Sequence, residues 1–212
     1  MVQYLARRFP SPALRRLARE ARRPLGKAAV DETLFPPAFY RLIVADHVAT
    51  LASIKTNPDP MGRVTARALH CDRLGLPGDY LATLEELATR GGYALTHAVL
   101  AARWTVENDC LTGQQVQLFQ EGAIERLEAM VDLIGVNTDL GIEGVAILYY
   151  GHARSHVRPE WIEAIPGAQR RDGGWAAAPD VAASNPHTTY LALWVLLEDA
   201  FPHAVDVSMI PR

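Results

Sequence analysis

Tyr80-Leu-Ala-Thr-Leu-Glu-Glu-Leu-Ala-Thr-Arg90 leads into Gly91-Gly92-Tyr93 and then into Thr96-His97-Ala-Val-Leu-Ala-Ala-Arg-Trp104. Further along, Trp161-Ile-Glu-Ala-Ile-Pro-Gly-Ala-Gln-Arg-Arg-Asp172 leads into Gly173-Gly174-Trp175 and then into His187-Thr-Thr-Tyr-Leu-Ala-Leu-Trp194. Each copy predicts a helix, a Gly-Gly-aromatic turn and a second helix, which opens with a histidine seven residues before a tryptophan. A repeated helical hairpin is typical of stacked or ring-shaped α architectures.

Helix signals dominate the rest of the chain as well. Proline, glycine and capping residues separate apolar segments with helical spacing, and no stretch alternates apolar and polar residues as a half-buried strand does. The sequence therefore predicts an all-α fold, an α/α-hairpin ring or partial α/α toroid spanning residues 31–212. We predict helices at residues 13–23, 37–55, 63–74, 80–89, 95–107, 114–134, 139–150, 159–168 and 186–197.

Residues 1–30 form a separate unit, which we predict to be a basic amphipathic helical arm. They hold eight basic side chains and one acidic side chain, Glu20. The arm could bind an acidic partner or a membrane surface, or it could lie against the acidic remainder of its own chain. The whole chain has a net charge of −3 and the arm lacks an aromatic stacking platform, so we expect no nucleic-acid partner.

The compartment is predicted from what the sequence lacks. No apolar run approaches the roughly 20 residues of a transmembrane helix, and the N-terminus has no apolar secretory core. Cys71 and Cys110 are too few for a disulfide framework, so we expect two small buried thiols. These observations together favour the cytoplasm.

The second copy of the repeat resembles a known superfamily. Its Gly173-Gly174-Trp175 turn and the following segment from His187 to Trp194 are similar to repeats of the α/α-toroid terpenoid cyclases and protein prenyltransferases. The resemblance implies an inner and an outer ring of helices, with a ligand at the mouth of the inner ring and Trp175 among its candidate contacts. It concerns the fold more than the activity.

Three residues are candidates for a metal site. His97 and His187 hold equivalent places in the two copies, so their imidazoles should emerge at one end of the bundle. Glu143 lies in the almost wholly apolar segment 141–150, where a buried carboxylate needs a cation, a donor or a metal. Two imidazoles and a carboxylate form a set that suits zinc or another divalent transition metal. The hypothesis is a small-molecule or peptide ligand site, and a metal there would suit a metal-dependent enzyme.

Simpler interpretations stand beside this one. The histidines could bond turn carbonyls, Glu143 could pair with Arg103 or Arg154, and Asp139 could join the site or only cap its helix. His152 and His156, four residues apart, could share a metal or form an exposed pair at a helix end. A non-catalytic scaffold that retains only the architecture is the alternative to a ligand-binding protein. In either case Trp104 and Trp194 are predicted to be buried between hairpins.

Overall fold

The computed structural model describes residues 2–21, 36–44 and 46–211. Within these ranges every regular element is a helix, and no strand is present, so the predicted all-α class is confirmed. The elements are α1 (Val2–Arg8), α2 (Pro12–Ala21), η1 (Pro37–Leu42), α3 (Leu51–Lys55), α4 (Pro60–Leu69), α5 (Cys71–Leu74), α6 (Tyr80–Thr89), α7 (Gly92–Glu107), α8 (Gly113–Ile134), α9 (Asp139–Tyr150), η2 (Arg154–His156), α10 (Pro159–Gly167) and α11 (Pro186–Ala200).

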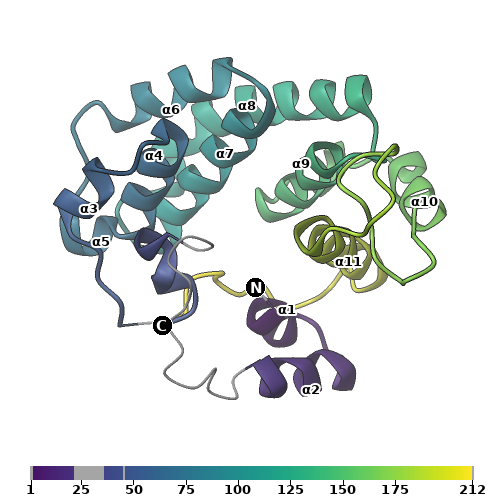
Figure 1. Cartoon of the computed structure of the whole chain (residues 1–212). Helices are drawn as coiled ribbons and strands as arrows, with labels where there is room; N and C mark the ends of the chain where they lie inside the picture. Colours follow the sequence, from purple (N-terminus) through teal and green to yellow (C-terminus); the bar gives the residue numbers. More distant parts are fainter. Residues whose placement is uncertain (1, 22–35, 45, 212) are drawn as a thin grey trace.

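Three consecutive hairpins make up most of the molecule. α6 packs on α7, α8 on α9 and α10 on α11, while α7 contacts α9 and α9 contacts α11. In Figure 1, α7, α9 and α11 lie on the inner side of this row, and α6, α8 and α10 lie on its outer side. α4 packs against α7 and extends the row at its other end. The inner helices bring their N-terminal halves together, and this arrangement positions the site.

The two Gly-Gly turns differ more than their sequences indicate. In the first copy Gly91 (φ 69°) and Gly92 (φ 55°) adopt left-handed conformations that favour glycine, and α7 begins directly at Gly92. The predicted start near residue 95 is therefore wrong by three residues. In the second copy an extended loop separates Trp175 from Asn185, whose side chain caps α11 by accepting from the amides of His187 and Thr188.

Two predicted helices are interrupted. The predicted helix at 37–55 is instead a short 3-10 helix, η1, followed by an irregular connection and α3. Thr50 starts α3 with a capping box to Ser53, so the chain restarts a helix there rather than continuing one. The predicted helix at 63–74 divides at His70 into α4 and α5. The predicted helices at 80–89 and 139–150 have the bounds of α6 and α9.

One core cluster runs through the whole row of helices. Most residues of α9 are buried, because α7, α8 and α11 pack on its different faces. Trp104 and Trp194 are each 1 % exposed, which confirms that both indoles are buried. Trp194 also donates from Nε1 to Glu198 at 2.9 Å, so its polar atom is satisfied inside the core.

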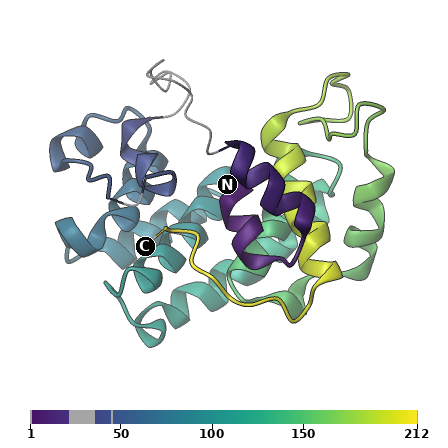
Figure 2. The same ribbon diagram turned by 90° about the horizontal axis from the view of Figure 1, so that it is seen from below.

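The described part of the N-terminal arm packs on the body of the molecule. Tyr4 of α1 makes edge-on contacts with Tyr150 of α9 and Trp194 of α11. Arg8 pairs with Glu198 through two hydrogen bonds of 2.6 and 2.9 Å. Figure 2 shows α1 beside α11, with the C-terminal segment passing from α11 towards α7. The first helix thus lies against its own chain, while residues 22–30 of the predicted arm fall outside the described residues.

Cys71 and Cys110 form a disulfide, which corrects the expectation of two free thiols. The bond joins the first turn of α5 to the connection after α7, and it closes a loop with a sequence separation of 39 residues. Disulfides persist in oxidising compartments, so this bond does not support the sequence-based argument for the cytoplasm. No helix within the described residues is both long and apolar enough to cross a membrane.

Candidate functional site

An apolar cavity of about 380 Å³ lies between the inner helices and η1. Its walls are mostly apolar side chains, and its acidic and imidazole groups come from α7, α9 and α11. The polar residues that line it are Thr65, His97, Glu143 and His187, and the main apolar ones include Phe39, Leu100, Trp104, Ile147, Leu191 and Met209. A mostly apolar cavity with a few convergent polar groups is the usual form of a small-molecule site.

Asp139 holds His187 from the first turn of α9. Its Oδ1 accepts from Nδ1 of His187 at 3.0 Å and from the hydroxyl of Thr188 at 2.5 Å. Its Oδ2 accepts from the hydroxyl of Tyr93 at 2.7 Å, and its own amide donates to the carbonyl of Ala177. The backbone cap of α9 is made by Thr138 rather than Asp139. The capping interpretation of Asp139 is therefore wrong, and its side chain belongs to the site.

Glu143 lies one helical turn after Asp139 on the same face of α9 and is 5 % exposed. Its Oε1 accepts from the hydroxyl of Thr96, and its Oε2 is 3.7 Å from Nε2 of His187. Within the described residues neither Arg103 nor Arg154 pairs with it: Arg103 pairs with Glu107 and Asp206, and Arg154 with Glu198. A core ion pair with arginine is thus the wrong interpretation of Glu143.

His97 approaches the same carboxylate from α7. Its Nδ1 is 3.6 Å from Oε1 of Glu143 and 2.9 Å from the carbonyl oxygen of Tyr93. The expected bond to a turn carbonyl is therefore present together with the approach to Glu143. Among the residues that the structure describes, Asp139, Glu143 and His187 offer metal-ligating atoms within 4.8 Å of one another. His97 lies beside this group, which differs from the predicted set of His97, Glu143 and His187.

The surroundings shift the pKa values of Asp139 and Glu143 in opposite directions. Burial acts to raise the pKa of Asp139, but hydrogen bonds from His187, Thr188 and Tyr93 outweigh it and lower that pKa to about 2. Burial raises the pKa of Glu143, although the nearby His97 and the Thr96 hydroxyl oppose this. The hydrogen bond to Asp139 raises the pKa of His187. The surroundings of the site therefore lower the pKa of one carboxylate and raise that of the other.

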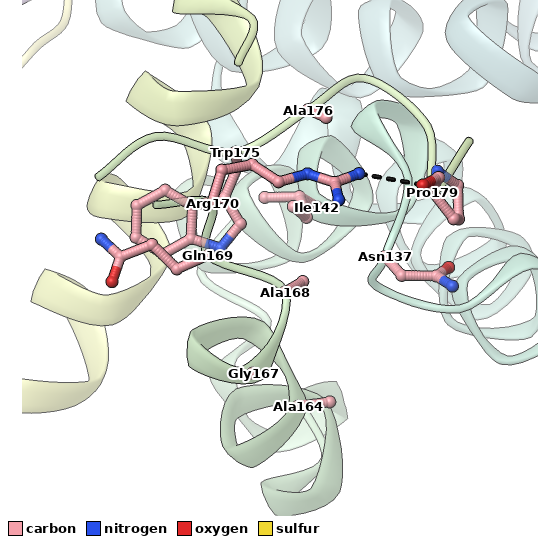
Figure 3. Close-up of a pocket in the computed structure, with 10 residues that line it drawn as sticks. All are labelled: Asn137, Ile142, Ala164, Gly167, Ala168, Gln169, Arg170, Trp175, Ala176 and Pro179. Atoms are coloured by element: carbon pink, nitrogen blue, oxygen red, sulfur yellow. Dashed lines mark hydrogen bonds between the residues drawn. The ribbon is translucent and has the colours of Figure 1, made fainter. Parts of the chain in front are cut away.

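Trp175 contributes to a different cavity. Its indole N–H donates to the carbonyl of Ile165 at 2.8 Å, and its backbone amide donates to Thr189. Figure 3 shows it beside Arg170, whose guanidinium donates to the carbonyl of Pro179 across a space of about 410 Å³. Trp175 does not line the cavity that contains Glu143. Its contacts hold the Gly-Gly turn against α10 and α11.

The remaining histidine pair does not form a shared site. His152 pairs with Asp206 at 3.1 Å, whereas His156 pairs with Glu128 at 2.7 Å. His152 lies in a turn after α9 and His156 in η2, so the two residues do not share a helix, and each imidazole has its own carboxylate.

Sequence reasoning missed the hydroxyl donors of the site. Thr96 precedes His97 and Thr188 follows His187, and both donate to a buried carboxylate. The signal available was the Thr-His and His-Thr pairing within the repeat, which places a hydroxyl next to each imidazole.

Comparison with family models, curated proteins and solved structures finds no match for this chain.

Proposed function

We propose that Glu143 and His187 bind a divalent transition metal at the polar end of the apolar cavity, that Asp139 orients His187 for this role, and that a small molecule binds beside the metal. One observation carries the proposal: two buried carboxylates and an imidazole place ligand atoms within 4.8 Å of one another, and the ion-pair partners of these carboxylates among the described residues are the imidazoles of His97 and His187. Buried carboxylates require compensating charge. A metal ion would supply it, and carboxylate and imidazole ligands suit zinc and neighbouring metals.

The hydrogen bond between Asp139 and His187 favours this role. A histidine that binds a metal through one nitrogen commonly donates from the other to a carboxylate, which fixes the orientation of the ring. Nδ1 of His187 is engaged by Asp139, so Nε2, which is 3.7 Å from Glu143, is the nitrogen left for the metal. The side chain of His187 is 50 % exposed, and this gives an ion access from solvent.

A metal would share the site with a proton. Burial raises the pKa of Glu143, so its carboxylate holds a proton more strongly than an exposed glutamate does. Metal binding requires the ionised carboxylate, so loading the site should release a proton. A metal so held could act as a Lewis acid on a bound molecule, which would make the protein a metal-dependent enzyme.

Three further parts of the proposal concern the architecture, the exposed surface of α2 and the compartment. The inner and outer order of the hairpins supports a partial α/α toroid, with the cavity at the rim of its inner helices. The outward arginines of α2, Arg15, Arg16 and Arg19, are exposed, and they support contact of this helix with an acidic partner or membrane surface. The disulfide favours an oxidising compartment over the cytoplasm.

Calorimetric titration of tag-free, metal-stripped protein with zinc tests the metal site. We expect one zinc per chain, with proton release detected by repeating the titration in buffers of different ionisation enthalpy. Glu143→Gln and His187→Ala should abolish binding, whereas His156→Ala, which removes an imidazole from a separate carboxylate pair, should leave it unchanged. Absence of zinc binding, or equal binding by all variants, would overturn the proposal and favour the non-catalytic scaffold.

A further inference from the structure

The residues that line the cavity change from polar to apolar along each inner helix. The first lining residues of α7, α9 and α11 are His97, Glu143 and His187, respectively. The later ones are aliphatic or aromatic, namely Leu100 and Trp104 of α7, Ile147 of α9, and Leu191 and Trp194 of α11. They follow the polar residue of their helix at spacings of three, four or seven positions, which keep side chains on one face. Each inner helix therefore contributes a stripe that is polar at its start and apolar beyond it.

The three stripes run in the same direction. α7, α9 and α11 alternate with the outer helices along the row of hairpins (Figure 1), so the inner helices share one sense. At the start of the stripes, His97 and His187 both lie within 3.7 Å of Glu143. Further along, the ring centroids of Tyr150 in α9 and Trp194 in α11 are 5.7 Å apart. The cavity thus has its polar groups together at one end, and its remainder is apolar.

The polar end presents a hydrogen-bond acceptor. Oε1 of Glu143 accepts from Thr96, whereas Oε2 accepts no hydrogen bond from the residues that the structure describes. Thr65, the remaining polar residue of the lining, donates its hydroxyl to the carbonyl of Met61 at 2.8 Å. A ligand with a hydroxyl group can donate to Oε2, whereas an anionic ligand would place a further negative charge beside Glu143 and Asp139.

We propose that the cavity binds a medium-chain alcohol, with its hydroxyl beside Glu143 and its hydrocarbon chain along the apolar stripes of the inner helices. The inference rests on the proposed role of the cavity as a ligand site, and it names the class of ligand. The hydroxyl donates to Oε2 of Glu143 in the metal-free protein, and its oxygen can ligate a metal bound there. His187 and Trp194 are seven residues apart on α11, a rise of about 10 Å, which an extended chain of about eight carbons spans. Burial of the chain against the apolar walls supplies the affinity, since each methylene removed from water favours binding.

A series of straight-chain alcohols tests the inference by NMR titration of 15N-labelled protein. The titrations contain a chelator, so that they do not depend on any metal. We expect the dissociation constant to fall about fourfold per methylene from butan-1-ol to octan-1-ol. It should then stay level to decan-1-ol, because the longer chain extends beyond the stripes. Octanoate, which replaces the hydroxyl by a carboxylate on a chain of the same length, should bind roughly tenfold more weakly than octan-1-ol.

Two leucine variants separate the cavity from the surface. Leu100→Asn places an amide in the apolar wall, whereas Leu118→Asn changes a side chain of α8 that is 85 % exposed. Octan-1-ol should bind Leu100→Asn roughly tenfold more weakly than the wild type, and Leu118→Asn as tightly as the wild type. Melting curves check that both variants fold, and the wild-type series decides the inference even where Leu100→Asn does not.

Four results would overturn the inference: no binding of any alcohol, a dissociation constant that is the same along the series, octanoate binding as tightly as octan-1-ol, or equal binding by the two folded variants. Zinc calorimetry of the wild type without chelator or alcohol reports separately on the metal site, so either proposal can fail alone.

Discussion

Asp139 and Glu143 are the same kind of side chain, one helical turn apart, and their surroundings give them different roles. Three donors surround Asp139 and keep its pKa near 2, so it stays charged and orients His187. Glu143 has the Thr96 hydroxyl and two imidazoles near it, but its burial dominates and raises its pKa. Buried carboxylates whose environments separate their pKa values often mark a chemical site.

A pH effect away from this site is expected at His70. The imidazole is fully buried and contacts the carbonyl oxygen of Ala38 at 2.8 Å, and burial lowers its pKa below 6.5. Because the folded-state pKa is depressed, the neutral ring contributes stability above pH 6.5 that is lost as the pH falls through the folded-state value. Urea unfolding between pH 7.5 and 5.5 should therefore show the wild type losing up to about 1.4 kcal/mol per pH unit more than His70→Gln. Parallel pH dependences of the two proteins would contradict this role.

Residues of the site were predictable from the sequence only where they differ from their neighbours or recur at matched positions. Glu143 is conspicuous as a carboxylate in an apolar helix, and His97 and His187 as matched positions of a repeat. The structure brings both histidines to within 3.7 Å of Glu143. The role of Asp139 was not predictable, because Thr138 and Asp139 are adjacent residues that can both cap a helix. Only the loop before α11, which carries Ala177 and positions His187, decides between them.

Among the elements, the start of α9 depends on one close backbone approach. A Cβ atom on Gly141 would lie 1.8 Å from the carbonyl oxygen of Gly135, whereas a Cβ on Gly122 in the middle of α8 would meet nothing within 4 Å. We expect Gly141→Ala to displace the start of α9 and cost several kcal/mol, because the obstructing atom belongs to the backbone. Gly122→Ala should instead stabilise the protein by about 0.5–1 kcal/mol through helix propensity.

Thermal or urea unfolding of Gly141→Ala and Gly122→Ala measures the change in stability that each substitution causes. Equal effects of the two substitutions would show that the approach of Gly135 to α9 is not tight.

The connection between α5 and the end of α7 depends on the disulfide. Replacing both Cys71 and Cys110 by serine should lower the free energy of unfolding by about 2–4 kcal/mol, because the unfolded chain regains the freedom of a long loop. Non-reducing peptide mapping should recover the two cysteines in one linked species. Alkylation of both thiols in the folded, unreduced protein would show that the bond does not form.

Element boundaries were predictable where local signals are strong. Asp79 precedes α6 and Thr138 caps α9, and these helices have their predicted bounds. The segment 37–55 was mispredicted because its apolar residues have helical spacing, yet Ile43, Val44 and Val48 are about half exposed. Their spacing therefore reports no buried helical face. Arg41 instead holds η1 by pairing with Asp72 and donating to the carbonyl of Leu69, and such long-range contacts leave no periodic signal.

At the scale of the whole molecule, the repeat predicted the hairpins and the all-α class. It also predicted the burial of Trp104 and Trp194, because both follow a helix start at a fixed spacing. The cavity was not predictable in the same way. It is bounded by η1 and by Met209 of the C-terminal segment as well as by the repeated helices. These parts lie outside the repeat, and only tertiary packing brings them to the site.

The central claim is that α9 and α11 together hold one metal ion between Glu143 and His187, with Asp139 orienting the imidazole. Anomalous diffraction at the zinc absorption edge, from crystals grown with zinc, tests it most directly. We predict a single strong peak per chain, about 2.0–2.2 Å from Nε2 of His187 and from a carboxylate oxygen of Glu143. A map without a peak between these two atoms, or with its main peak at His156 and Glu128, would contradict the account.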